Sequence, residues 1–344
     1  MRGGFFEGFR GYLSAIAWVL AGLALGSGCE RAPSGSAGRA GPGAMASASS
    51  RQRPATTPET GAPDATVSAA AVPPRELSWR FEQGPFGPTD VLISVPASSD
   101  PAQRFPVLVA FHGRGESGKG SVQGARGWWD DYLLGRAITR LEHPPLDSRD
   151  FETYVSGERL EQINRDLLTR PYAGLIVVCP FLPDVLAGER AWGQGERLAD
   201  FIADTLLPRV YAKTPAIGTA PTTGVDGVSL GGRAALLVGL SRPRAFGSVG
   251  SLQAALDASE VEHFAALAAH ALAQNPRLSL RLLTSDEDYF QSQNQALSAA
   301  LSARAVPHAL AQVKGTHSYQ FNRGPGALEM LLFHSRVLRG QPPP

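Results

Sequence analysis

The sequence predicts an α/β fold with a mostly parallel central sheet and helices on both faces. From residue 77 onward, short apolar runs typical of strands alternate with segments whose apolar residues have helical spacing. Such alternation is typical of parallel sheets covered by helices. Residues 75–344 are also long enough for one large α/β domain and too short for two independent ones of this class. We therefore expect a single domain over this range.

Eight strands are expected, in chain order. They are predicted at residues 78–82, 91–95, 107–111, 175–179, 224–228, 247–252, 278–283 and 309–313. Helical spacing precedes the fifth strand (Leu198, Phe201, Ile202, Leu206), follows the seventh (Leu297, Ala300, Leu301) and ends the chain (Leu328, Leu331, Leu332, Leu338). No internal repeat interrupts this order.

The first 29 residues are typical of a signal peptide. Arg2 and Arg10 precede fourteen mostly apolar residues at 12–25, which are too few to cross a bilayer comfortably. Small residues then lead to Cys29, as in a bacterial lipobox, although Gly26 stands where a Leu is usual. We expect export to the bacterial cell envelope (periplasm, outer membrane or cell surface), with a lipid anchor on Cys29. An uncleaved signal anchor is the alternative.

Composition limits what the rest of the chain binds. Residues 30–74 are rich in Ala, Gly, Ser, Pro and Thr with almost no large apolar side chains, which predicts a disordered tether. The net charge of +1 and the charged fraction of 18% give no field that attracts nucleic acid, so nucleic acid is not an expected partner.

Cys179, in an apolar strand, is expected to be a small buried residue.

Ser229 lies in the segment 227–232 (GVSLGG), directly after the fifth predicted strand. The pattern predicts a turn from strand to helix so sharp that the serine hydroxyl projects from the backbone, with glycines two residues to either side. With 38 glycines in the chain, such a pattern also arises by chance in roughly one of every few chains. An apolar helical segment follows at once, and an acid and a histidine come later in the order that a serine triad on this fold requires. We predict Ser229 as a nucleophile; the alternative is an ordinary glycine-rich turn.

His317 is the best candidate for the base that a serine nucleophile needs. It follows the last predicted strand, in a short Gly-Thr-His loop that can return the ring over Ser229. Other histidines lie in helical patterns or in turns flanked by proline, where a structural role is expected: His143, His263, His270, His308 and His334.

The acid is expected in the loop after the next-to-last strand, where Asp286, Glu287 and Asp288 stand. We favour Asp288, because the acid of such a site lies a few residues beyond the strand and just ahead of a helix. Asp286 is the reserve, and Glu287 or an acid elsewhere is not excluded.

Two backbone N–H groups are candidates for stabilising a negatively charged intermediate. Leu230 follows the nucleophile directly, and Arg114 lies in the His-Gly loop after the third predicted strand. The Arg114 side chain either meets a substrate carboxylate or is solvated.

The segment 113–119 (GRGESGK) resembles a nucleotide-binding loop. It matches G-x-G-x-x-G and most of a P-loop, yet Gly120 stands where Ser or Thr would hold Mg²⁺. Both motifs need a helix to open here, and glycines at 118, 120, 124 and 127 oppose one. No H-E-x-x-H or paired histidines indicate a metal. We expect no cofactor and no metal.

A long connection at residues 114–173 is predicted to be an insertion near the mouth of the site. Its aromatic residues either shape a pocket for an aromatic or acyl group or pack the insertion onto the sheet: Trp128, Trp129, Tyr132 and Tyr154.

The chain resembles the putative-esterase group of α/β hydrolases, which includes esterase D-like enzymes, feruloyl and acetyl-xylan esterases, iron-siderophore esterases and mycolyltransferases. The matching segments are 107–113, 227–232, 246–251, 288–290 and 315–319, and they span most of 106–338. The resemblance implies an α/β-hydrolase catalytic domain at 75–344, with Ser229 as nucleophile, Asp288 as acid and His317 as base. Asp226 and Ser285 depart from the group's pattern, and the sequence assigns Asp226 no role.

The expected function is that of an exported, lipid-anchored serine hydrolase. It would cleave small-molecule or glycan-linked carboxylic esters through an acyl-enzyme intermediate. An acyltransferase with the same triad is one alternative. A catalytically inactive α/β-hydrolase-like lipoprotein that binds a glycan or a partner is the other. The sequence sets neither the substrate nor the oligomeric state.

Overall fold

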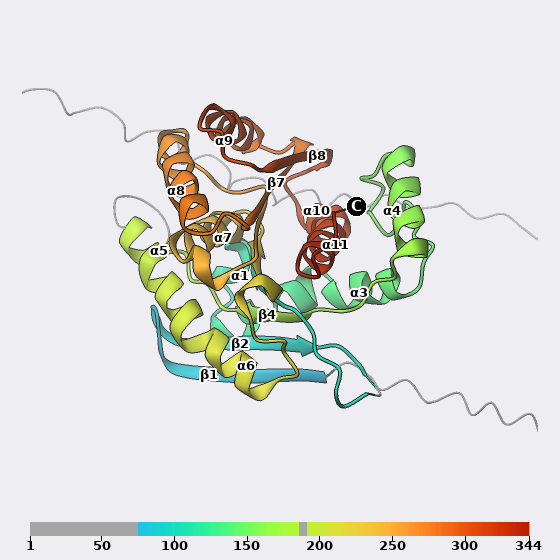
Figure 1. The fold of residues 1–344 in the computed structure, drawn as a ribbon, viewed down its shortest axis with the longest axis horizontal. Helices are drawn as coiled ribbons and strands as arrows, with labels where there is room; N and C mark the ends of the chain where they lie inside the picture. Colours follow the sequence, from blue (N-terminus) through green and yellow to red (C-terminus); the bar gives the residue numbers. More distant parts are fainter. Residues whose placement is uncertain (1–74, 99, 186–190, 344) are drawn as a thin grey trace, which may run out of the picture. The chain divides into compact units, whose positions relative to one another are not determined.

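The computed structural model describes residues 75–98, 100–185 and 191–343 (Figure 1). The signal peptide predicted at 1–29, the tether predicted at 30–74 and the lipidation site predicted at Cys29 lie outside these residues. None of the helices in the described ranges is long and apolar enough to cross a membrane.

One eight-stranded sheet organises the described residues, in the spatial order β1-β2-β4-β3-β5-β6-β7-β8. The strands are β1 (Arg75–Gly84), β2 (Gly87–Val95), β3 (Val107–Phe111), β4 (Ile176–Pro180), β5 (Thr223–Gly227), β6 (Ser248–Leu252), β7 (Ser279–Glu287) and β8 (Ala309–Thr316). The β1–β2 and β2–β4 pairs are antiparallel, and all pairs from β4 onward are parallel. The predicted α/β fold with a mostly parallel sheet is confirmed, and each predicted strand overlaps an observed one.

The central strands are apolar on both faces because helices cover both. In β3, Val107, Val109 and Phe111 belong to one core cluster, while Leu108 and Ala110 belong to the other. All five side chains are fully buried. Such continuous apolar runs are what a parallel sheet between two helical layers requires.

Helices form a layer on each face of the sheet (Figure 1). One layer contains α5 (Ala191–Asp200), the π-helical turn η2 (Phe201–Leu206), α6 (Leu207–Lys213), α7 (Leu230–Ser241), α8 (Val261–Gln274) and α9 (Gln291–Ala303). The other contains α3 (Leu134–Glu142), α4 (Gly157–Thr169) and α11 (Ala327–Val337). Shorter elements are α1 (Arg114–Ser117), α2 (Ser121–Ala125), η1 (Gly127–Asp131), η3 (Ala220–Thr222), η4 (Pro243–Ala245), η5 (Ala258–Glu260), α10 (Tyr319–Phe321) and η6 (Asn322–Gly326).

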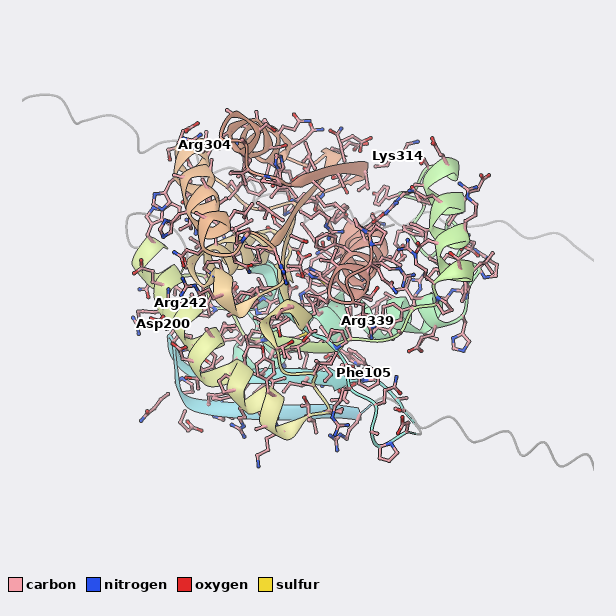
Figure 2. The ribbon with its side chains drawn as sticks, in the orientation of Figure 1. Phe105, Asp200, Arg242, Arg304, Lys314 and Arg339 are labelled. Atoms are coloured by element: carbon pink, nitrogen blue, oxygen red, sulfur yellow. The ribbon has the colours of Figure 1, made fainter. Side chains whose placement is uncertain are left out.

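An ion pair marks where two helices of the first layer meet. Arg242 follows α7, Asp200 ends α5, and the two side chains lie together at the outer surface (Figure 2). Because both side chains are partly exposed, such a pair adds about 1 kcal/mol or less to stability. The apolar residues beneath it, such as Leu198 and Leu237, carry the packing.

The predicted insertion at 114–173 contains α1, α2, η1, α3 and α4. Trp128 and Tyr132 are buried, with their rings edge-to-face at 5.0 Å. Trp129 packs against the same core cluster. Packing is therefore the main role of these aromatic residues, although Tyr132 also reaches the cavity described below.

The prediction that no helix opens in the glycine-rich segment after β3 is wrong: α1 begins at Arg114, α2 contains Gly124, and η1 begins at Gly127. Helix α1 begins at Arg114 and ends after four residues at Gly118. Gly120 then has a φ of +81°, which no helix tolerates, so the turn cannot continue. The segment 113–119 thus forms a single turn instead of the long helix that a nucleotide-binding loop needs.

Cys179 is buried in β4, as expected. Burial raises the pKa of its thiol to about 12, which keeps it protonated and unreactive at neutral pH.

Candidate active site

Ser229 forms the turn between β5 and α7 and has a φ of +58° and a ψ of −118°. This backbone conformation is strained for a residue with a Cβ and typically costs about 1–3 kcal/mol. The crowding around it explains the flanking glycines. A Cβ on Gly227 would lie 2.4 Å from the Gly231 carbonyl oxygen, and one on Gly231 would lie 2.4 Å from the Phe111 carbonyl oxygen.

A chain of hydrogen bonds starts at the Ser229 hydroxyl. Its Oγ lies 2.9 Å from Nε2 of His317, and Nδ1 of His317 lies 2.8 Å from Oδ1 of Asp288. A carboxylate only accepts, so the imidazole donates from Nδ1 and is left to accept the serine proton at Nε2. This is the tautomer that a general base for Ser229 requires.

Asp288 is held by donors other than His317. The Thr284 hydroxyl donates to Oδ2 at 2.8 Å, and the Phe290 N–H donates to Oδ1 at 3.0 Å. Its side chain is fully buried, so these hydrogen bonds replace the water that a carboxylate loses on burial.

Asp286, the reserve acid, lies elsewhere. Strand β7 continues through Glu287, so Asp286 is still within the strand, exposed, and its Oδ1 accepts from the Gly315 N–H at 2.9 Å. The end of β7 thus decides which carboxylate faces His317, and it selects Asp288.

Two aromatic rings flank the imidazole of His317. The centroids of Tyr289 and Phe290 lie 4.4 and 5.4 Å from that of His317, and the Tyr289 hydroxyl donates to the His317 carbonyl oxygen at 3.1 Å. Only 13% of the His317 side chain is exposed. The ring is therefore held in one orientation by packing as well as by Asp288.

The loop after β3 is fixed on both sides of Gly113. Nε2 of His112 accepts from the Leu182 N–H at 3.0 Å, so its Nδ1 donates to the Gly113 carbonyl oxygen at 2.8 Å. The hydroxyl of Tyr132 accepts from the Gly113 N–H at 3.1 Å. In a trans peptide the N–H points opposite to the carbonyl of the same peptide group, so the bond from His112 to the Gly113 carbonyl oxygen also sets the direction of the Arg114 N–H.

Leu230 and Arg114 each begin a helix, α7 and α1 respectively. The first N–H groups of a helix have no partner within it and are free to bind an anion. The side chain of Arg114 is 65% exposed and pairs with Asp184 at 2.9 Å, which agrees with a solvated position.

Ser229 and His317 open on a cavity of about 460 Å³. Its lining residues come from the loop after β3, from the turn into α7, and from the loops after β7 and β8: Gly113, Arg114, Gly115, Glu116, Tyr132, Ser229, Leu230, Ala255, Tyr289, Phe290, His317, Ser318, Tyr319 and Asn322. Two larger cavities, of about 530 and 760 Å³, have neither Ser229 nor His317 in their walls. The smaller cavity is the one that holds reactive groups.

Asp226, which the sequence left without a role, belongs to a buried network. Its Oδ2 accepts from Nε2 of His334 at 2.9 Å and from Arg281 at 3.2 Å, and Nδ1 of His334 lies 2.8 Å from the Ser248 hydroxyl. Asp226, His334 and Ser248 are fully buried. Burial is the main cause that lowers the pKa of His334, so the ring is neutral at pH 7.

Two glycines make room for this network. A Cβ on Gly250 would lie 1.9 Å from Oδ2 of Asp226, and a Cβ on Gly224 would lie 2.5 Å from Nδ1 of His334. One feature of the sequence indicated this network: Asp226 is a charged residue in an otherwise apolar strand. The partner could not be inferred, because His334 lies 108 positions away.

The glycine-rich segment also contains a residue that sequence reasoning missed. Glu116 is fully buried and lines the same cavity as Ser229. Nothing in the spacing of the segment indicates a buried carboxylate.

Comparisons with known proteins agree with the fold. The family model described as "Putative esterase" matches residues 188–323, a range that includes Ser229, Asp288 and His317. No curated protein matches the sequence.

Solved structures match over most of the chain. A ferulic acid esterase covers 77% of this chain and 99% of its own length, with 15% identity and a TM-score of 0.58. The S-formylglutathione hydrolase FrmB from Staphylococcus aureus covers 77% and 97%, with 14% identity and a TM-score of 0.54. The fluorophosphonate-binding serine hydrolase F of the same organism covers 76% and 99%, with 14% identity and a TM-score of 0.51. These likenesses show an α/β-hydrolase fold, and within it residues 188–323 are similar to the esterase family.

Proposed function

We propose that the chain cleaves carboxylic esters by a two-step acyl-enzyme mechanism. Ser229 is the nucleophile, His317 the general base and then the general acid, and Asp288 the residue that orients the imidazole. The observation that carries this proposal is the unbroken run of hydrogen bonds from Ser229 through His317 to Asp288 at the wall of a cavity.

In the first step the Ser229 oxygen attacks the ester carbonyl while Nε2 of His317 takes the hydroxyl proton. Asp288 stabilises the imidazolium, which then gives its proton to the leaving alcohol. In the second step the same imidazole activates a water molecule, which attacks the acyl-enzyme and releases the acid.

The negative oxygen of each tetrahedral intermediate is bound by the backbone N–H groups of Leu230 and Arg114. Support comes from their position, since both begin helices and both line the cavity beside Ser229. Preorganised donors of this kind contribute about 10²- to 10³-fold each to the rate.

The substrates are small-molecule or glycan-linked esters. Tyr289 and Tyr319 line the cavity and are 69% and 40% exposed, so their rings are available to stack on an aromatic acyl group or a sugar. Similar structures include a ferulic acid esterase and an S-formylglutathione hydrolase, which supports an ester or thioester carbonyl as the reacting group. A panel of p-nitrophenyl esters of increasing chain length, beside feruloyl and acetyl-sugar esters, ranks these classes.

The chain is also proposed to be exported and anchored by a lipid on Cys29. The support is the charged, apolar and small-residue order of residues 1–29 and the composition of 30–74. Metabolic labelling with a fatty acid, compared between the natural chain and Cys29→Ser, tests the anchor. Equal labelling of both chains contradicts it.

The deciding experiment for the reaction is Ser229→Ala. Loss of a triad nucleophile lowers kcat by as much as about 10⁶-fold, which we expect on p-nitrophenyl acetate. A fluorophosphonate probe should add its mass to the wild-type chain and leave Ser229→Ala unlabelled. Turnover by the variant close to that of the wild type, or a folded wild type that the probe does not label, contradicts the proposal. Product analysis with an added sugar or lipid alcohol then separates hydrolysis from acyl transfer.

A further inference from the structure

A second buried carboxylate lies in the wall of the active-site cavity. Glu116, in α1, is fully buried. Its Oε2 accepts from the hydroxyl of Tyr132, and its Oε1 accepts from the hydroxyl of Tyr319 at 2.6 Å. Lys119 stands 3.9 Å from Oε1 but bonds Asp131 at 2.6 Å. Burying a carboxylate is costly unless its oxygens are paired, so the two tyrosine hydroxyls account for its stability there.

Three glycines, one in the segment 113–119 and two shortly after it, make the space for Glu116 and its partners. A Cβ on Gly127 would lie 2.4 Å from Cγ of Glu116, and one on Gly124 would lie 2.7 Å from its carbonyl oxygen. A Cβ on Gly115 would lie 2.6 Å from the hydroxyl of Tyr319. The glycine-rich segment therefore accommodates a carboxylate and its two partners.

One of these partners, Tyr132, connects Glu116 to the loop after β3, which carries the Arg114 N–H. The Tyr132 hydroxyl accepts from the Gly113 N–H and donates to Glu116. Because a hydroxyl carries a single proton, the bond to Glu116 commits that proton and leaves a lone pair for Gly113. Glu116 thus fixes the hydroxyl that holds the Gly113 N–H, and Gly113 is the residue directly before Arg114.

The other partner connects Glu116 to the loop that carries the base. Tyr319 begins α10, two residues after His317, and its hydroxyl bonds a carboxylate 203 positions earlier in the chain. Its ring also packs 5.6 Å from that of Tyr132. The loop of His317 and the loop of Arg114 therefore share one buried anchor.

We propose that Glu116 is a positioning residue. Through Tyr132 it holds the loop that carries the Arg114 N–H, and through Tyr319 it holds the loop that carries His317. This inference rests on the proposed function of Ser229, His317 and Asp288, and it adds a residue that touches none of the reacting atoms.

The test is Glu116→Gln, which keeps the shape of the side chain. The two hydroxyls donate to different oxygens of Glu116, and an amide places a donor NH₂ on one of those two sides, so one hydroxyl loses its acceptor. We expect kcat on p-nitrophenyl acetate to fall by about 10- to 100-fold, below the full cost of losing an oxyanion donor, while KM changes by less than about threefold. Hydrogen exchange followed by mass spectrometry should show faster exchange in two separate peptides, one covering 112–118 and one covering 314–321.

Glu329→Gln is the matched control. Glu329 is buried to a similar degree, forms an ion pair with Arg159 in α4, and lines a different cavity. The same substitution there should lower stability but leave kcat and the exchange of both loops within about twofold of the wild type.

Should Glu116→Gln not fold, Tyr319→Phe gives the same readouts. It removes one hydrogen bond from a ring that is 40% exposed, and kcat should fall by roughly fivefold.

The outcomes separate the two proposals. Unchanged kcat in Glu116→Gln, exchange that rises in only one loop, or equal effects in Glu329→Gln overturn the positioning role. A wild type that hydrolyses no ester overturns the proposed function instead, and the exchange data then still decide whether Glu116 couples the two loops.

Discussion

The described residues contain two hydrogen-bonded sets of serine, histidine and aspartate, and the two sets differ in what surrounds them. Ser229, His317 and Asp288 meet at a cavity, and the imidazole is 13% exposed. The other set, made of Ser248, His334 and Asp226, is sealed between the sheet and α11. We therefore propose that identical residue types support chemistry in one place and packing in the other.

The two sets also differ in the orientation of the ring and in charge. The ring of His317 faces serine with Nε2 and aspartate with Nδ1, whereas that of His334 faces aspartate with Nε2 and serine with Nδ1. Asp226 is additionally paired with the buried Arg281. A carboxylate already neutralised by a cation has less charge left to stabilise an imidazolium. Solvent access, ring orientation and neighbouring charge therefore distinguish the proposed catalytic set from the buried set.

Replacing each histidine gives the largest contrast. We expect His317→Ala to lower kcat by up to about 10⁶-fold with little change in stability, because the base for Ser229 is lost. In contrast, His334→Ala should keep kcat within about threefold but reduce the free energy of unfolding by about 2–4 kcal/mol, since it leaves a cavity and unpaired buried groups. Ester turnover and urea unfolding of both variants measure this. A drop in kcat of similar size in both would remove the distinction between the sets.

Replacing each aspartate sharpens the same contrast. Asp288→Asn should lower kcat by about 10⁴-fold, because the imidazole is no longer held in the working tautomer. Asp226→Asn should instead destabilise the fold by about 3–5 kcal/mol, since it leaves the buried Arg281 without its counter-ion. Steady-state kinetics at 25 °C, checked against the unfolding curve of each variant, separate the two effects. Stable folding of Asp226→Asn at wild-type level would contradict the role assigned to the network.

The sealed histidine predicts a pH dependence of stability. Burial lowers the pKa of His334 below the usual value near 6.5, so below that pH the unfolded chain binds a proton that the folded chain does not. Stability is fully present above about pH 6.5 and falls as pH drops toward the folded pKa, by at most about 1.4 kcal/mol per pH unit for one group. His112 is buried in the same way and acts in the same direction.

Urea unfolding at several pH values between 7.5 and 5.5 measures this slope. His334→Gln, which does not titrate, should show a shallower slope than the wild type. Equal slopes in the two proteins would mean that His334 does not contribute.

The smallest effect concerns the two carboxylates near the end of β7. Asp286→Asn should change kcat by less than about threefold, because an amide oxygen still accepts from the Gly315 N–H. A loss comparable to that expected for Asp288→Asn would transfer the acid role to Asp286.

Local pattern was enough to predict the parts of the molecule that depend on near neighbours. Strand runs and helical spacing predicted the sheet, and the glycines around Ser229 predicted a sharp turn whose crowding the structure explains. The order of Ser229, Asp288 and His317 predicted which side chains would meet, because loops after parallel strands gather at one edge of the sheet. Their catalytic roles stay predictions until the variants are measured.

Distant pairings could not be predicted from the sequence. Asp226 depends on a histidine in α11, and Glu116 depends on tyrosines 16 and 203 positions away. The distinction between Asp286 and Asp288 depends on where β7 ends in its pairing with β8, which continues through Glu287. Each is a property of tertiary packing that no window of the sequence contains.

The strained backbone of Ser229 has a practical consequence. Its φ of +58° suits glycine better than serine, so Ser229→Gly should relieve strain worth about 1 kcal/mol while removing the hydroxyl. The variant would be inactive and more stable than the natural chain, so an intact ester could stay bound in it long enough to be crystallised. If the proposed role of Ser229 holds, the active chain is less stable than its inactive variant, as is common where a strained site is needed for activity.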